Sequence, residues 1–175
     1  FHLLEKIKNV GYDGVEIPIF GGEEKIEHFQ NIGKVLKDND LKCTSVTVIP
    51  DESRSPISED INVRSKALDY VKWAMDCSHA LESEVLGGPY HQPLGVFSGE
   101  PPTLKEKENA AKVHQDAADY ALDINLQLSI EPLNRFECYF LNIGQDASDY
   151  VDMVDRKNFG YLYDTFHANI EEKDP

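Results

Sequence analysis

Apolar residues recur along this chain in two alternating patterns. In short segments every second residue is apolar, which is typical of a strand with one buried face; in longer segments apolar residues lie three or four positions apart, as on an amphipathic helix. The pattern predicts a first helix, ended by Gly11, whose buried face consists of Leu3, Leu4, Ile7 and Val10. Five strands are then expected, at residues 14–20, 42–49, 83–90, 126–131 and 159–164.

Helices are expected between these strands. Their buried stripes lie within residues 26–36, 67–74, 103–125 and 142–154. Thr103 and Glu106 have the spacing of a capping box, in which each side chain bonds the backbone N–H of the other residue. Asn142 and Gln145 suggest a second capped helix start, and the last strand is expected to lead into a polar loop.

Regular alternation of strands and helices implies an α/β fold with a parallel sheet covered by helices. Within 126–131 the apolar residues Leu126, Leu128 and Ile130 are expected to face the helices, while the polar side chains between them, up to Glu131, face a barrel interior. A doubly wound open sheet would make both faces of its central strands apolar. The sequence therefore predicts a partial (β/α)₈ TIM barrel of about five parallel strands with flanking helices.

The last strand repeats this arrangement. Gly160, Leu162 and Asp164 are expected to face the interior, and Tyr161 and Tyr163 to face outward. In a (β/α)₈ barrel the carboxyl ends of the strands form the rim where active sites lie. Chemistry is therefore expected at the ends of the strands that stop near 131 and 164.

Charge narrows the range of partners. The chain has 32 acidic against 17 basic residues, a formal net charge of −15. Nonspecific nucleic-acid binding depends on Lys and Arg neutralising phosphates, so we expect no nucleic-acid partner. A neutral or metal-chelated small substrate suits this charge better.

The sequence shows neither a membrane-spanning segment nor a secretion leader. No run approaches the roughly 18 apolar residues of a membrane span, and the opening FHLLEKIKNVGYDG shows no basic-then-apolar leader. Cys43, Cys77 and Cys138 are odd in number and lack zinc-like spacing, so reduced thiols are expected. We therefore expect a cytoplasmic protein without a membrane partner.

Two carboxylates stand at successive strand ends. Glu131 and Asp164 would be neighbours on the rim of a parallel barrel, where their charges repel unless a cation lies between them. Oxygen ligands of this kind suit Mg²⁺ or Mn²⁺. His167, three residues beyond Asp164, could be a ligand, a proton carrier or a donor to a substrate hydroxyl, and Glu137 is a candidate because it follows Glu131 closely.

Other polar or small residues are interpreted as structural. Gly87 and Gly88 are assigned to a tight turn, although they could also let a ligand approach the backbone. Glu16 is expected to pair with a neighbouring group, and Trp73 is expected in the core. His91, in the loop after the third strand, is a weak site candidate.

Two segments carry a family resemblance. IEPLNRFE, residues 130–137, together with YDTFHANIEE, residues 163–172, resembles the D-tagatose 3-epimerase family, which includes D-psicose (allulose) 3-epimerases and belongs to the xylose-isomerase-like barrel superfamily. GYDGVEIP and GGPY are also similar to family features. Related endonuclease barrels carry a pattern like DT-x-H, whereas NRFE after the strand-end glutamate favours ketose epimerases.

The resemblance implies roles at matching positions. Glu131 would be a metal ligand and one of two acid–base glutamates, and Asp164 would be the second ligand of Mn²⁺ or Mg²⁺. Glu137 and His167 would bind oxygens near the carbonyl of a ketose substrate. The resemblance also implies a homo-oligomer, a dimer or a tetramer, and places a further histidine ligand and the second glutamate beyond Pro175.

The length suggests an incomplete barrel. The chain opens inside a helix and stops at Pro175, where a barrel of about 250 residues would continue. No linker divides residues 1–175, so we expect a single barrel domain truncated at both ends and inactive by itself. The interior face of such a fragment would be open to water.

Several related functions stay open at this point. An aldose–ketose isomerase or an inosose dehydratase would look the same at the level of these motifs. An endonuclease IV-like nuclease would need a basic groove, which the acidic excess disfavours. A sugar-binding relative without catalysis would lack the second glutamate.

Overall fold

The computed structural model describes residues 2–175. Its strands form one parallel sheet in which spatial order follows chain order, β1-β2-β3-β4-β5. A doubly wound sheet would reverse its strand order at a switch point. The consecutive order therefore agrees with the predicted part of a barrel, and the strands are β1 (Gly14–Pro18), β2 (Lys42–Val46), β3 (Val85–Gly88), β4 (Gln127–Ile130) and β5 (Phe159–Tyr161).

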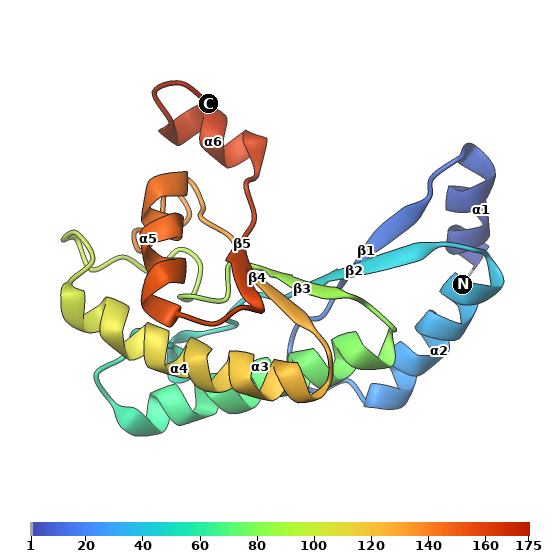
Figure 1. Cartoon of the computed structure of the whole chain (residues 1–175), viewed down its shortest axis with the longest axis horizontal. Coiled ribbons are helices and arrows are strands. Elements are labelled where there is room, and N and C mark those ends of the chain that lie inside the picture. Colours follow the sequence, from blue (N-terminus) through green and yellow to red (C-terminus); the bar gives the residue numbers. More distant parts are fainter. Residues whose placement is uncertain (1) are drawn as a thin grey trace.

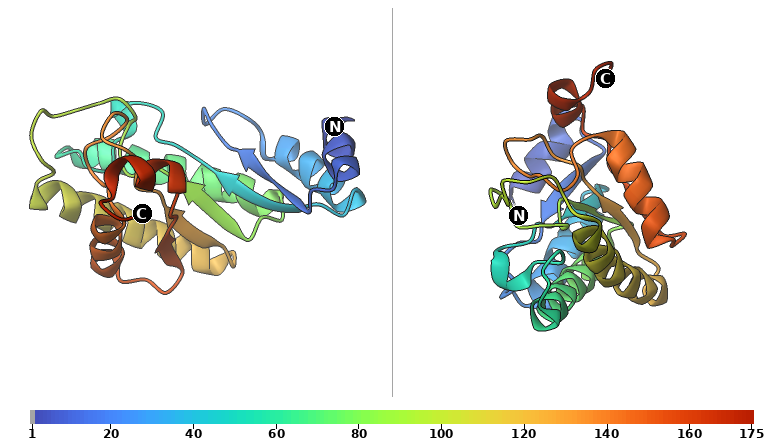
Figure 2. Two further views of the ribbon diagram at one scale, coloured as in Figure 1. Left: turned by 90° about the horizontal axis from the view of Figure 1, so that it is seen from above. Right: turned by 90° about the vertical axis from the view of Figure 1, so that its left-hand side faces the viewer.

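Helices cover one face of this sheet. Figures 1 and 2 show α2, α3 and α4 along that face, with α1 at one end of the molecule and α6 on the side of the sheet away from α3 and α4. No helix within residues 2–175 is both long and apolar enough to cross a membrane. The helical elements are α1 (His2–Val10), α2 (Ile26–Asp38), the short 3₁₀ helix η1 (Glu52–Arg54), α3 (Ile61–Ala80), α4 (Leu104–Asp123), α5 (Gly144–Val154) and α6 (Thr165–Glu171).

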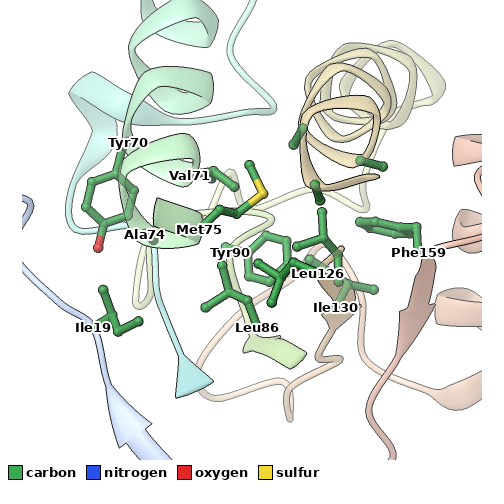
Figure 3. Packing of buried hydrophobic residues seen from close by; sticks show 14 of the residues in the cluster. Ile19, Tyr70, Val71, Ala74, Met75, Leu86, Tyr90, Leu126, Ile130 and Phe159 are labelled. Carbon is green, nitrogen blue, oxygen red and sulfur yellow. The ribbon is translucent and has the colours of Figure 1, made fainter. Parts of the chain in front are cut away.

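The core lies between the sheet and α3 and α4. Leu86 of β3 and Ile130 of β4 are fully buried; Leu86 faces Val71 and Met75 of α3, and Ile130 lies beside Leu126 on the Phe159 side of the core (Figure 3). Burying an aliphatic side chain of this size stabilises the fold by about 1.5–3 kcal/mol. On the opposite face of β4, Gln127 is exposed, which confirms the predicted alternation of helix-facing and interior-facing residues.

Helix α4 begins and packs as its sequence predicts. The Thr103 hydroxyl accepts a hydrogen bond from the Glu106 amide at 3.2 Å, and the Glu106 carboxylate accepts one from the Thr103 amide at 2.7 Å. This reciprocal pair is the capping box. The buried face of the helix carries many small side chains, which let the helix approach the sheet closely. They are Ala110, Ala111, Ala117, Ala118 and Ala121.

Two expectations about the C-terminal region are wrong. The last strand ends at Tyr161 and not at Asp164, and the segment after it is helix α6 rather than a polar loop. Leu162 still donates its amide to the Ile130 carbonyl at 2.8 Å, after which the Asp164 carboxylate accepts the Phe166 amide at 2.7 Å. A helix start therefore replaces the end of the strand.

The predicted cap at Asn142 is also wrong. Helix α5 has Ile143 at its N-cap position, with no hydrogen bond from that side chain. The Asn142 amide group instead donates to the Leu133 carbonyl at 2.7 Å, and the Glu172 carboxylate accepts the Gly144 amide at 2.8 Å. A residue from the other side of the site supplies the cap, because its carboxylate can satisfy an orphan N–H at the helix start.

Two further structural expectations are wrong. Of the predicted buried face of the first helix only Leu4 is buried, since Leu3 and Val10 are exposed. Gly87 and Gly88 belong to strand β3 rather than to a tight turn.

The expectations for the cysteines and Trp73 are confirmed. Cys43, Cys77 and Cys138 are free thiols, and the last two are buried. Trp73 packs against the core, and its indole N–H donates to the Glu24 carbonyl at 3.2 Å.

Gly88 ends β3 in a backbone conformation that requires glycine. Its φ is +121°, and a Cβ there would lie 2.3 Å from the Thr47 carbonyl oxygen. Its own carbonyl accepts the Glu131 amide at 3.0 Å. The close approach of β2 and the start of the segment after β4 therefore both depend on this glycine.

We predict that Gly88→Ala lowers the free energy of unfolding by roughly 2–5 kcal/mol, because both backbone strain and the Thr47 clash oppose it. Gly99→Ala is the matched control, since Gly99 has φ +81° but open space around it. The control should cost only about 1 kcal/mol from strain. Urea denaturation measures both values, and equal costs would contradict the steric account.

His114 of α4 is a buried neutral histidine. Its Nδ1 lies 2.6 Å from the Tyr150 hydroxyl, and its Nε2 donates to the Tyr90 carbonyl at 3.3 Å. Burial lowers its pKa from 6.5 to about 4. The folded pKa lies below the unfolded value, so the unfolded chain binds more protons between these two pH values.

We therefore predict that His114 makes the protein less stable as the pH falls below 6.5. Between pH 7 and pH 5 its contribution to the free energy of unfolding should drop by about 2 kcal/mol. His114→Gln removes that contribution, so urea denaturation at the two pH values should show a smaller loss for the variant. Equal losses would mean that His114 titrates alike in the folded and unfolded states.

Candidate active site

Glu131 and Asp164 lie close together just beyond the ends of β4 and β5. The Glu131 amide bonds the Gly88 carbonyl at 3.0 Å and the Leu162 amide bonds the Ile130 carbonyl at 2.8 Å, so the strand pairing continues up to the site. Ligand atoms of Glu131, Asp164 and His167 all lie within 4.8 Å of one another. The structure thus brings together three of the four predicted site residues.

The site disfavours the ionised form of Glu131. Burial, and then the negative charge of Asp164, raise the pKa of Glu131 to about 7, and Glu16 and Glu137 add further negative charge. A cation between the carboxylates would offset this repulsion. Carboxylate oxygens are also the donors that Mg²⁺ and Mn²⁺ prefer, so the residues present fit a divalent cation.

Asp164 has two different tasks for its two oxygens. Oδ1 caps helix α6 by accepting the Phe166 amide at 2.7 Å. Oδ2 lies 3.8 Å from Nε2 of His167, and the side chain is 39% exposed. The cap fixes the direction of the carboxylate, which leaves Oδ2 available for an ion.

His167 is held as a hydrogen-bond donor to the site. Its Nδ1 lies 3.1 Å from the Asn134 amide nitrogen, which donates to it, and 2.9 Å from the Asn134 side-chain nitrogen. A nitrogen that accepts an N–H bond carries no proton, so in the neutral ring the proton is on Nε2. Nε2 faces Asp164 and presents N–H rather than a lone pair, which suits a substrate oxygen better than a metal.

Glu137, the fourth predicted residue, joins the site through Asn134. The Asn134 side-chain amide donates to Glu137 Oε1 at 2.7 Å, and the Glu137 amide bonds the Asn134 carbonyl at 3.0 Å. Glu137 Oε1 lies 4.0 Å from Nδ1 of His167. Asn134 was not singled out from the sequence, where its only signal is its place in the NRFE motif.

The segment that carries these residues is fastened at two further points. Arg135 makes a bidentate ion pair with Glu171 of α6, with both N–O distances 2.9 Å, and its amide also donates to Glu171 at 2.7 Å. The Tyr139 hydroxyl donates to Glu106 at the start of α4 at 2.6 Å. The Asn134–Glu137 turn is therefore held against α6 and α4.

The remaining candidates lie outside the group of Glu131, Asp164 and His167. Glu16 accepts a hydrogen bond from the Thr44 hydroxyl at 3.2 Å, as the predicted pairing requires. A Cβ on Gly87 would lie 2.8 Å from the Leu162 side chain, so this glycine leaves room for Leu162 on the interior face. His91 is fully buried outside the carboxylate cluster, and burial lowers its pKa to about 3.

Comparison with protein families agrees with this geometry. A family model described as "Xylose isomerase-like TIM barrel" matches residues 4–175. The chain belongs to this family. The match covers nearly the whole chain and includes both segments of the site.

Two curated relatives that match nearly the whole chain are ketose epimerases. The chain is 29% identical over 173 residues to a probable ketose 3-epimerase of Synechocystis sp., covering 99% of this chain and 59% of the relative. It is 30% identical over 172 residues to the D-psicose 3-epimerase of Agrobacterium fabrum, covering 97% and 59%. The chain thus spans about 59% of the length of these relatives.

Solved structures support the same fold. A crystal structure of D-psicose 3-epimerase determined in the presence of D-fructose superposes with a TM-score of 0.89 and 28% sequence identity, covering 98% of this chain and 60% of the other. The five-stranded sheet with its helices is therefore part of a TIM barrel like those of the epimerases.

The hydrogen bonding at His167 leads to a prediction about metal affinity. Asp164→Asn should weaken Mn²⁺ binding by roughly 10-fold or more, because the ligand charge is lost while asparagine can still cap α6. His167→Ala should change that affinity by less than about 3-fold, since the ring presents N–H to the site. Mn²⁺ titration of the whole protein measures both, and equal losses would make His167 a ligand.

Proposed function

We propose that the whole protein is a metal-dependent ketose 3-epimerase. One observation carries this proposal: two groups of side chains meet at the same rim of an epimerase-like barrel. The first group is the carboxylate pair Glu131 and Asp164, and the second is His167 and Glu137, which Asn134 links by hydrogen bonds. Glu131 and Asp164 can bind a cation, and Glu131 can also carry a proton. His167 and Glu137 can bind the oxygens of a sugar. The epimerase names of the curated relatives support the same substrate class.

The chemistry begins with a proton next to a ketone. The Glu131 carboxylate takes the proton from C3, the C3–H electron pair forms a double bond to C2, and the carbonyl electrons move to the oxygen to give an enediolate. When bound by Glu131 and Asp164, a divalent cation would stabilise negative charge on the substrate oxygens. Returning a proton to the opposite face of C3 completes the epimerisation without any change in oxidation state.

His167 and Glu137 would orient the substrate. The Nε2–H of His167 can donate to a carbonyl or hydroxyl oxygen, and the Glu137 carboxylate can accept from a hydroxyl. Asn134 bonds both side chains, so the two contacts keep a fixed spacing. A sugar bound this way would present C3 to Glu131 in one orientation, which lowers the entropic part of the barrier.

The opposite face of C3 needs a second acid–base group. We place it outside these 175 residues, in the part of the barrel that the relatives have in addition. Cytoplasmic location and assembly into dimers or tetramers belong to the same proposal.

We predict that the whole protein, treated with chelator and resupplied with Mn²⁺ or Mg²⁺, interconverts D-fructose and D-psicose. Glu131→Gln should lower kcat by at least about 1000-fold with the urea midpoint almost unchanged, because the amide keeps the shape but cannot carry the proton. His167→Ala should mainly raise KM. Sugar analysis by chromatography measures both constants.

Two results would contradict this function. Unchanged sugars with every metal, together with cleavage of abasic DNA, would favour the nuclease. Conversion of the ketose to an aldose, without a C3 epimer, would assign the protein to the aldose–ketose isomerases.

A further inference from the structure

The loop after β3 crosses to the segment that carries Glu131 and Glu137. Its residues His91 and Gln92 are adjacent in the chain and both fully buried. Neither takes part in the carboxylate cluster. Their side chains make hydrogen bonds to the backbone of the segment between Glu131 and Phe140.

His91 bonds the backbone of Glu131 itself. Its Nε2 lies 3.0 Å from the Glu131 carbonyl oxygen, and a carbonyl can only accept, so the ring is the donor. The ring is stacked on Phe140, with centroids 5.6 Å apart and planes 28° apart. Burial and stacking leave the ring little freedom to turn away from this bond.

The bond acts where the strand ladder stops. The Glu131 amide is bonded to the Gly88 carbonyl at 3.0 Å, but the next residue, Pro132, has no N–H with which to continue the ladder. The His91 bond to the Glu131 carbonyl is therefore the next restraint along the chain. Glu131 is held on both sides, at its N–H and at its C=O, which fixes the backbone from which its side chain projects.

Gln92 holds the far end of the same segment. Its Oε1 accepts the amides of Tyr139 and Phe140 at 3.2 and 3.0 Å. Its Nε2 donates to the carbonyls of Pro93 and Val96 at 3.1 and 2.9 Å, so all its hydrogen-bonding groups are used. Gly95 of the same loop donates its amide to the Glu137 carbonyl at 2.9 Å.

We propose that His91 is a positioning residue that sets the direction of the Glu131 carboxylate, with Gln92 fixing the same segment near Glu137. This inference rests on the proposed function, because it assigns His91 a task in metal binding and proton transfer at Glu131. Residues that orient metal ligands in this way typically change metal affinity or activity by about 10- to 100-fold when they are replaced.

Three substitutions at His91 separate the hydrogen bond from the packing. His91→Phe keeps a ring to stack on Phe140 but has no donor. In His91→Gln the amide N–H can reach the position of Nε2, whereas in His91→Asn it is one methylene short. Asn158→Leu is the control, because Asn158 is also buried and donates to the Ala118 carbonyl at 2.9 Å, but lies before β5 at the opposite end of the sheet.

The experiment measures Mn²⁺ affinity, kcat for D-psicose and the urea midpoint of each whole-protein variant. His91→Phe and His91→Asn should lose roughly 10-fold or more in Mn²⁺ affinity and in kcat, and His91→Gln should recover most of both. Asn158→Leu should lower the urea midpoint and leave the Mn²⁺ affinity unchanged. If His91→Phe does not fold, the Asn and Gln pair decides.

Two outcomes overturn the inference. Wild-type Mn²⁺ affinity and kcat in His91→Phe or His91→Asn would show that the bond does not position Glu131. If Mn²⁺ affinity and kcat instead fall in proportion to the urea midpoint in every variant, Asn158→Leu included, the role of His91 is purely structural. A wild-type protein that neither binds Mn²⁺ nor epimerises would instead refute the proposed function, and this inference with it.

Discussion

The parallel pairing of β3, β4 and β5 is the constraint on which the candidate site depends. Each strand bonds the next in register, and single backbone bonds extend the pairing beyond the strands, from Glu131 to Gly88 and from Leu162 to Ile130. Because the strands run in the same direction, the residues that follow them meet at one rim. A slip of one residue would turn Glu131 towards the helices and separate it from Asp164.

At that rim the carboxylates of Glu131 and Asp164 lie close together, and hydrogen bonds hold the residues that carry them. Burial and the charge of Asp164 together raise the pKa of Glu131. The ionised form of Glu131 is therefore disfavoured unless a cation binds beside it. Hydrogen bonds hold the positions from which both side chains project: Oδ1 of Asp164 caps α6, and the backbone N–H and C=O of Glu131 are both bonded. A site of this kind is organised before metal or substrate binds, which is what electrostatic stabilisation requires.

The sequence predicted the parts of this structure that follow from local patterns. The alternation from Leu126 to Ile130 predicted which face of β4 is buried, and the spacing of Thr103 and Glu106 predicted the start of α4. Asp164 was placed at a strand end because alternation continues through Tyr163, although the ladder has already finished. Helix α6 has a weak apolar pattern and is held by tertiary contacts such as the Arg135 pair with Glu171.

Residues whose role depends on distant partners could not be predicted. The cap of α5 comes from Glu172, 28 residues away, so the local signal at Asn142 was misleading. His91 acts on a carbonyl 40 residues later, and in the sequence it is only a lone loop histidine. Asn134 matters because it bonds His167, a contact that only the fold creates.

The most direct test of the central claim is to follow the hydrogen on C3 of the substrate. The whole protein with Mn²⁺ is incubated with D-psicose in D₂O, and the sugars are analysed by NMR. If a carboxylate at this rim removes the proton next to the ketone, deuterium should enter at C3 as D-fructose forms, and Glu131→Gln should abolish both. Two results would contradict the account. One is deuterium that enters only at C1. The other is epimer formation in a single turnover that occurs without any exchange and is unaffected by Glu131→Gln.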